Sequence, residues 1–145
     1  MATRVQVVFD CADPGRQAAF WAEALHYHIP DPPEGHATWH DWARSMGIPE
    51  ERWNDWSSAE DPDGAGPRLF FQRVPEPKVA KNRVHLDVNA SGGHGVSDEE
   101  RRRRIDAEVA RLKALGAADA RGPMEQHGEY WVRMNDPEGN EFCVQ

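Results

Sequence analysis

The chain has 145 residues, of which 39% are hydrophobic, and a formal net charge of −8. A chain of this length buries about 70% of the surface that its unfolded form exposes, so we expect one domain that folds without disulfides. The acidic charge repels phosphate backbones and anionic lipids, which excludes nucleic acid and membrane surfaces as favoured partners.

The chain begins with an extended segment, RVQVVFD, that is typical of a β-strand. Asp13 followed by Pro14 then predicts the start of a helix, because Asp caps a helix and Pro suits its first position. Two extended pieces come later, NDWSSAED and PRLFFQRV, on either side of an Asp-Pro-Asp-Gly turn that begins at Asp61.

A tryptophan-rich insertion at about residues 35–56 interrupts this first half. Thr38 followed three residues later by Asp41 predicts a helix start there. Trp39 and Trp42 then fall on one helical face, and four of the six tryptophans lie between residues 39 and 56. Two interpretations are open: the tryptophans pack the insertion onto the domain or a second subunit, or they form an aromatic wall that stacks a flat ligand.

The second half repeats this order after a linker at residues 75–82 that is rich in Pro and Lys. A strand, RVHLDV, precedes a long arginine-rich helix that Ser97 caps and Gly116 ends. The arginines of this helix mostly face acids three or four residues away, which favours a solvated surface over an anion-binding patch. Three extended segments complete the chain: GAADARG, GEYWVRMND and NEFCVQ.

Two phrases occur twice in the same order, which indicates a duplicated module of roughly 75 residues. RVQ matches RVH at an offset of 79, so that Gln6 falls on His85. The Asp-Pro-acid-Gly turn at Asp61 matches the turn at Asp136 at an offset of 75. We therefore predict an α+β fold with module one at residues 1–75 and module two at residues 83–145, each a strand, a helix and three strands.

The chain resembles glyoxalase-like domain proteins of the vicinal oxygen chelate superfamily, which includes glyoxalases, bleomycin resistance proteins and extradiol dioxygenases. The stretches that carry the resemblance are VFDCADPGRQAAFWAEAL, KNRVHLDV and NDPEGNEFCV. It implies two βαβββ modules whose sheets form a cupped, partly open barrel. It also implies that the first and last strands of each module line the cup with four positions that hold a divalent ion in the metalloenzymes: Gln6, Gln72, His85 and Cys143.

These four residues are a poor ligand set for a divalent ion. A catalytic divalent ion generally binds one or two carboxylates beside imidazole, and none of the four is a carboxylate. His85 is the one strong ligand, and Cys143 suits zinc, but a His–Cys pair with two amides falls short of the usual zinc set. We therefore predict no tightly held metal and no cofactor, with a divalent metal ion at these four residues as the alternative.

Other groups near these positions have competing interpretations. Asp87 shares a strand face with His85 and could orient the imidazole or act as a base, but an ion pair with an arginine such as Arg83 is favoured. Glu141 shares the face of Cys143, where a solvent-facing acid is favoured over a ligand. Cys143 is a candidate nucleophile that His85 would activate, although inert packing is favoured for a cysteine on an inner strand.

The function that we predict is binding of a small aromatic or apolar molecule in the cup, by the four cup residues together with Trp39 and Trp42. The alternative is a divalent-metal-dependent lyase, isomerase or dioxygenase-type enzyme acting on a substrate with vicinal oxygens. A third hypothesis is that the protein is a structural module that binds a partner, and only the tryptophans support it.

We also expect a homodimer, because paired modules leave sheet edges and an apolar face that a second copy would cover. The two cysteines, Cys11 and Cys143, are too few for a disulfide framework and indicate a reducing compartment. The first ten residues do not resemble a signal peptide, and no window approaches the ~20 apolar residues of a membrane span. A cytoplasmic location is therefore expected.

Overall fold

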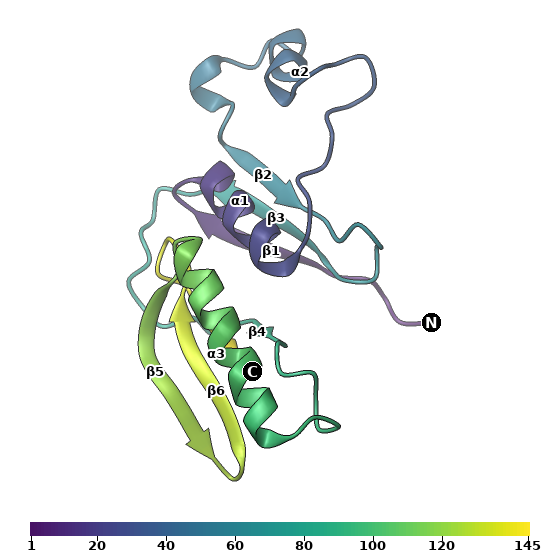
Figure 1. The fold of residues 1–145 in the computed structure, drawn as a ribbon. Coiled ribbons are helices and arrows are strands. Elements are labelled where there is room, and N and C mark those ends of the chain that lie inside the picture. Colours follow the sequence, from purple (N-terminus) through teal and green to yellow (C-terminus); the bar gives the residue numbers. More distant parts are fainter. The chain divides into compact units, whose positions relative to one another are not determined.

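A computed structural model describes all residues from Met1 to Gln145. The chain divides into two compact units, unit 1 (Met1–Pro77) and unit 2 (Lys78–Gln145), and the boundary falls inside the predicted linker. Each unit contains helices and one open sheet (Figure 1), so the predicted α+β class is confirmed. None of the helices combines the length and the apolar character that a membrane crossing requires.

Unit 1 has a three-stranded sheet in the order β1-β3-β2, with β1 parallel to β3 and β2 antiparallel to β3. Its elements in chain order are β1 (Gln6–Cys11), α1 (Pro14–Leu25), α2 (Trp39–Ser45), the short 3-10 helix η1 (Glu50–Arg52), β2 (Trp56–Ala59) and β3 (Arg68–Arg73). Helix α1 packs on β2 and β3, while α2 belongs to the insertion (Figure 1).

The core of unit 1 forms between α1 and the sheet. The Asp13 side chain accepts the backbone N–H of Arg16 at 3.2 Å, which confirms the predicted helix start. Trp21 of α1 is fully buried, as are Leu69 and Phe71 of β3. Burial of these three large apolar side chains fixes α1 to one face of the sheet.

The first of the three strands expected after α1 is reduced to an isolated bridge between His28 and Glu60. The residues that follow His28 include Pro30, Pro32 and Pro33. Proline has no N–H to donate to a strand ladder, so the extended segment stops after a single pairing.

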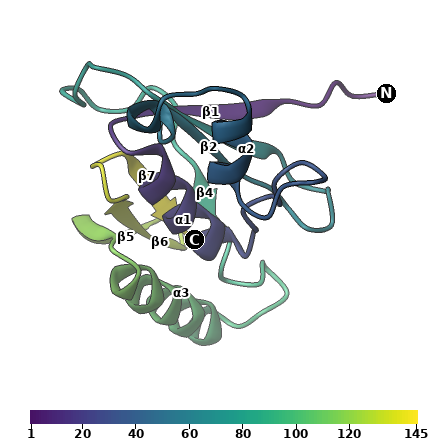
Figure 2. The ribbon, with the colours of Figure 1, turned by 90° about the horizontal axis from the view of Figure 1, so that it is seen from above.

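Unit 2 contains the complete βαβββ order. Its elements are β4 (Asp87–Val88), α3 (Asp98–Ala114), β5 (Ala118–Gln126), β6 (Glu129–Asn135) and β7 (Glu141–Val144). The sheet order is β4-β7-β6-β5, with β4 parallel to β7. Helix α3 packs on β6 and β7, and Figure 2 shows it along this sheet. Ile105 and Leu112 of α3 are buried, as are Val132, Met134 and Phe142 of these two strands.

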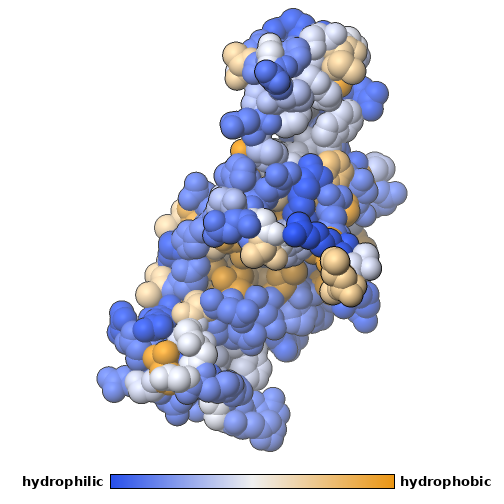
Figure 3. All heavy atoms as spheres, turned by 90° about the vertical axis from the view of Figure 1, so that its right-hand side faces the viewer, coloured by the Kyte–Doolittle hydropathy of each residue, from blue (hydrophilic) through white to orange (hydrophobic).

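The arginine run of α3 is a solvated, ion-paired surface, as expected. Arg103 and Arg104 both bind the Glu100 carboxylate, at 2.7 and 2.8 Å, and Arg111 binds Glu108 at 2.6 Å. Hydrophilic residues cover most of the molecular face shown in Figure 3.

The repeated Asp-Pro-acid-Gly turns share one internal hydrogen-bonding scheme. In unit 2, Asp136 accepts the backbone N–H groups of Glu138 and Asn140 at 2.9 and 3.0 Å, and the Asn140 side-chain amide at 2.8 Å. In unit 1, Asp61 accepts the N–H groups of Asp63 and Gly66 at 3.0 and 2.6 Å. The repeated aspartate is therefore the acceptor that closes each turn before the last strand.

Replacing Asp136 with Ala is expected to lower the free energy of unfolding by about 2–3 kcal/mol, because the side chain is 3% exposed and its donors would lose a charged acceptor. Urea unfolding followed by circular dichroism measures this. The matched change Asp63→Ala, in the equivalent turn but at an exposed position, should cost less than about 0.5 kcal/mol. If both variants lost the same free energy of unfolding, Asp136 would not have the proposed role as the acceptor that closes the turn.

Candidate functional site

A hollow of about 450 Å³ opens on the face of the unit 2 sheet opposite α3. We call it the unit 2 hollow. It contains a thiol, an imidazole, carboxylates and cationic groups on an aromatic base, and its lining residues are Lys81, His85, Asp87, Glu129, Tyr130, Trp131, Arg133, Glu141, Phe142, Cys143 and Gln145.

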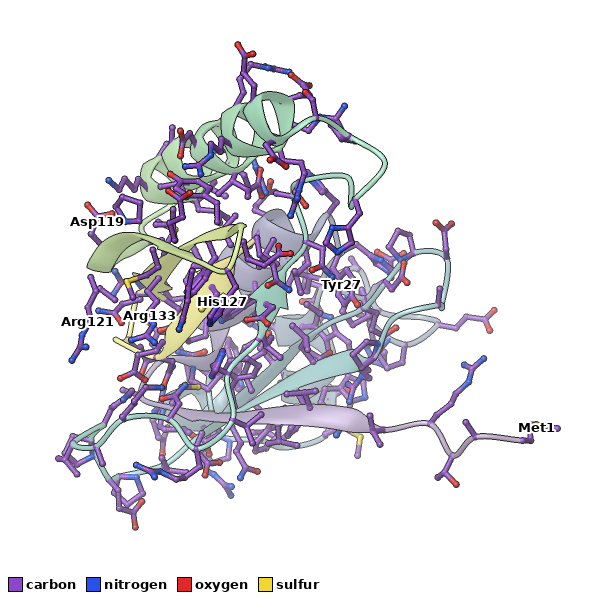
Figure 4. The ribbon with its side chains drawn as sticks, turned by 90° about the horizontal axis from the view of Figure 1, so that it is seen from below. Met1, Tyr27, Asp119, Arg121, His127 and Arg133 are labelled. Carbon is purple, nitrogen blue, oxygen red and sulfur yellow. The ribbon has the colours of Figure 1, made fainter.

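Strand pairing brings the central groups of this hollow together. Asp87 of β4 lies directly opposite Cys143 of β7, and Cys143 lies opposite Arg133 of β6. Residues that face each other across paired strands project from the same side of the sheet, as do residues two apart on one strand. His85 precedes β4 by two residues, and its side chain lines the same hollow as this row. The Arg133 side chain is labelled beside the unit 2 strands in Figure 4.

His85, Asp87 and Cys143 form one cluster. The His85 Nε2 and Asp87 Oδ1 atoms are 3.5 Å apart, and one ligand atom from each of the three residues lies within 4.8 Å of the others. The side chains of His85 and Asp87 are each 43% exposed, whereas Cys143 is buried. The favoured sequence interpretation, an ion pair between Asp87 and Arg83, is wrong: Asp87 contacts His85 and Cys143 instead, because the parallel register of β4 and β7 turns it toward them.

The Cys143 thiol is held in its neutral form. Burial raises the pKa of Cys143, and the negative charge of Asp87 raises it further, against a smaller opposing effect of Arg133. The thiol and the Asp87 carboxylate lie within 4.8 Å of each other. A cysteine nucleophile needs a lowered pKa, so this arrangement does not favour covalent catalysis by Cys143 with His85 as its base.

Glu141 anchors the linker to β7. Its carboxylate lies 3.1 Å from the Lys78 ammonium and accepts the backbone N–H of Asn82 at 3.0 Å. Desolvation alone would raise the pKa of Glu141, but the N–H donors and Lys78 together outweigh it and lower the pKa to about 2. The side chain therefore has a structural role as a partly exposed, ion-paired acid, and its possible role as a ligand stays a prediction.

The two glutamines predicted for the cup lie apart from each other in unit 1. Gln6 is opposite Arg68 in the β1–β3 register and accepts its guanidinium N–H at 2.7 Å. Gln72 is opposite Asp10 and donates to its carboxylate at 2.7 Å. The two positions are about 13 Å apart along the strands, so both amides cannot bind one ion. The four-residue metal set does not fit, and a cup shared by the four residues stays a prediction.

The strand register is compatible with two internal alignments. Taking Gln72 as the counterpart of Cys143 gives an offset of 77, because their direct partners are Asp10 and Asp87. Taking Phe70 as that counterpart gives the offset of 79, because the partner of Phe70 is Val8. The match of Gln6 with His85 therefore stays a prediction.

Unit 1 contains a larger hollow of about 900 Å³ between the insertion and the strands β2 and β3. We call it the aromatic hollow. All four tryptophans that the sequence singled out between residues 39 and 56 line it, and the structure adds Phe70. The other lining residues are Asp13, Gly15, Ile29, Pro30, Pro33, His40, Ala43, Ile48, Glu50, Glu51, Arg52, Asn54, Ser57, Ser58 and Arg68. Side chains of a strand point alternately to the two faces of its sheet. Leu69 and Phe71 of β3 are core residues, so Phe70 between them must point to the opposite face, and the sequence could have identified it as a residue of this hollow.

Two of the indole rings are fixed by hydrogen bonds. Trp39 donates its Nε1–H to the Pro30 carbonyl at 2.7 Å, and Trp53 donates to the Ile48 carbonyl at 2.9 Å. Trp42 packs edge-on against Trp39, with ring centroids 5.5 Å apart. The insertion therefore carries its aromatic surface in a defined geometry.

Cationic groups in the aromatic hollow lie over aromatic rings and are neutralised by acids. The Arg68 guanidinium lies 5.3 Å from the Phe70 ring centroid and 2.8 Å from the Glu60 carboxylate. The Arg52 guanidinium lies 5.9 Å from the Trp56 ring centroid and is paired with an aspartate. The cationic groups of the hollow are thus neutralised, while Glu50 and Glu51 also line it.

Residues 6–145 match the family described as glyoxalase-like domain, and the chain belongs to this family. No curated protein is similar enough in sequence to be matched to it.

Solved structures share its fold at low sequence identity. A glyoxalase/bleomycin resistance protein/dioxygenase family enzyme from Burkholderia phytofirmans is 14% identical, with a TM-score of 0.61 over 96% of this chain and 94% of that chain. A protein from Agrobacterium tumefaciens is 15% identical, with a TM-score of 0.63 over 99% and 96%. A mutant of the fosfomycin resistance protein FosX from Listeria monocytogenes, complexed with Mn(II) and 1S,2S-dihydroxypropylphosphonic acid, is 12% identical, with a TM-score of 0.60 over 100% and 90%.

Replacing Glu141 with Gln should remove a pH-dependent part of the stability. Because the folded-state pKa of Glu141 is lowered to about 2, its contribution is present at neutral pH and is lost as the pH falls from about 5 toward 2. We expect the variant to be less stable by about 1–2 kcal/mol at pH 7, allowing for solvent screening, with the difference shrinking below pH 5. Urea midpoints at pH 7, 5 and 4 measure it, with the exposed Glu76→Gln as the control. A constant difference across these pH values would rule out this linkage.

Proposed function

We propose that the protein binds a flat, aromatic or apolar small molecule in the aromatic hollow, without a tightly held metal. The observation that carries this proposal is the gathering of four tryptophans and Phe70 around one space of about 900 Å³. Small-molecule sites generally have volumes of about 300–1,000 Å³ and are lined mainly by aromatic and apolar side chains.

The exposure of the rings supports a ligand in addition to internal packing. Trp39 is 39% exposed and Trp56 is 40% exposed, although both are large apolar side chains that gain free energy on leaving water. A flat molecule between them would cover this surface. Because the hydrogen bonds of Trp39 and Trp53 already fix their rings, little side-chain entropy is lost when the ligand binds.

The second candidate function is a divalent-metal-dependent lyase, isomerase or dioxygenase-type activity on a substrate with vicinal oxygens. Its support is the fold shared with a FosX mutant that was complexed with Mn(II), and the imidazole of His85 in the unit 2 hollow. The separation of Gln6 from Gln72 weighs against a metal site made of the four residues. Binding of a small molecule in the aromatic hollow is therefore our first proposal. A homodimer also remains a proposal, supported by the open sheet edges of both units.

Calorimetric titration with 2-naphthol and with decahydro-2-naphthol tests the aromatic hollow. The two probes have the same carbon skeleton, but only the first is flat and aromatic. We expect 2-naphthol to bind about three- to tenfold more tightly, since aromatic pairing adds about 0.5–1.5 kcal/mol beyond the area buried.

Trp56→Ala and Phe70→Ala should each weaken 2-naphthol binding about tenfold or more, in keeping with the loss of a stacking ring. Trp131→Phe, which changes an indole of unit 2, should leave it unaltered. Equal affinity for the two probes, or no effect of the unit 1 variants, would leave the tryptophans with a packing role only.

A further inference from the structure

We infer, on the basis of the function proposed above, that the ligand of the aromatic hollow is a flat aromatic cation. Such a molecule is a ring system that carries a protonated or quaternary nitrogen. Three features of unit 1 point to this class of ligand: its net charge, two carboxylates that line the hollow without an ion-pair partner, and the indole faces beside them.

The net charge of the chain is concentrated in the unit that contains the aromatic hollow. Residues 1–77 carry 13 acidic and six basic side chains, a net charge of −7, whereas residues 78–145 carry 12 acidic and 11 basic ones, a net charge of −1. The field around unit 1 therefore attracts cations and repels anions. A field of this kind raises the local concentration and the association rate of a ligand of opposite charge.

Glu50 and Glu51 of η1 line the hollow as carboxylates without a counter-ion. The two cations of the lining, Arg52 and Arg68, are each paired with an acid that does not line it, at 2.9 and 2.8 Å. The positive charges at the hollow are thus compensated, and the two free carboxylates are the charges that a ligand can neutralise. Both glutamates are exposed, so solvent screens them and we expect a gain of a few-fold in affinity.

The ring faces of the hollow suit a positive charge. The face of an indole attracts a cation that lies within about 6 Å of its centroid. One face shows this already, since the Arg52 guanidinium lies 5.9 Å from the Trp56 centroid. Trp39 and Trp42 pack edge-on against each other, and no arginine lies over either ring, so indole surface remains open to a ligand.

A flat aromatic cation uses the rings and the carboxylates together. Its ring stacks on the indoles, and its charge lies over an indole face close to the two glutamates. A neutral ring of the same size gains the stacking alone. An anionic ring also stacks, but the carboxylates and the field of unit 1 repel it.

Calorimetric titration with three probes of two fused rings tests this order of affinity at low salt and neutral pH. N-methylquinolinium is a permanent cation, quinoline is its neutral counterpart, and 2-naphthoate is an anion. We expect N-methylquinolinium to bind about three- to tenfold more tightly than quinoline, and 2-naphthoate to bind more weakly than quinoline. Because salt screens exposed charges, the preference for the cation should shrink between about 20 and 500 mM NaCl.

Variants identify the charges responsible. The double variant Glu50→Gln/Glu51→Gln should reduce the ratio of the two affinities to about twofold or less. The control Asp63→Asn/Glu76→Gln removes the same charge from exposed positions of unit 1 outside the hollow, and should change the ratio by less than about twofold. Circular dichroism establishes that each variant is folded. If the double variant does not fold, Glu50→Gln and Glu51→Gln alone should each lower the ratio by a smaller amount.

The outcomes separate this inference from the proposal on which it rests. Equal affinity for N-methylquinolinium and quinoline, tighter binding of 2-naphthoate than of N-methylquinolinium, or a ratio that the loss of both glutamates leaves unchanged would overturn the cationic ligand. If 2-naphthol still bound in that case, binding of a flat molecule in the aromatic hollow would stand. If none of the probes bound, both proposals would be refuted.

Discussion

The parallel pairing of the first and last strands is the constraint on which the chemistry of both units depends. It places Asp10 beside Gln72 in unit 1 and Asp87 beside Cys143 in unit 2. Because α1 and α3 each pack on one face of their sheet, these rows are on the opposite face. The Asp-Pro-acid-Gly turns support this arrangement, since each one delivers the chain into its last strand through an aspartate that is bonded to the turn itself.

Local features of the fold could be predicted from the sequence, because the interactions that create them span only a few residues. The caps at Asp13, Thr38 and Ser97 are all formed, and the turn glycines Gly64 and Gly139 have positive φ. Each of these depends on one side chain or one backbone angle, so the residue type identifies it.

The register and the nonlocal partners could not be predicted in the same way. Offsets of 77 and 79 both keep a residue on the same face, since strand side chains alternate with a period of two. The matching letters RVQ and RVH favour the offset of 79, and the pairing of the first and last strands is compatible with either offset. Likewise, nothing within a few residues of Glu141 indicates that its partners are Lys78 and Asn82, on the linker.

Charged groups are arranged differently in the two hollows. In the aromatic hollow, Arg52 and Arg68 are paired with acids and lie over rings, while Glu50 and Glu51 also line the space. In the unit 2 hollow, a carboxylate, an imidazole and a thiol meet within one small cluster, with Arg133 alongside. Burial stabilises an apolar ligand in proportion to the area that leaves water, whereas a polar or charged ligand is stabilised by its electrostatic interactions with the groups around it. Most of the rings of the aromatic hollow belong to the insertion, so its aromatic character comes from this added segment and not from the duplicated strands.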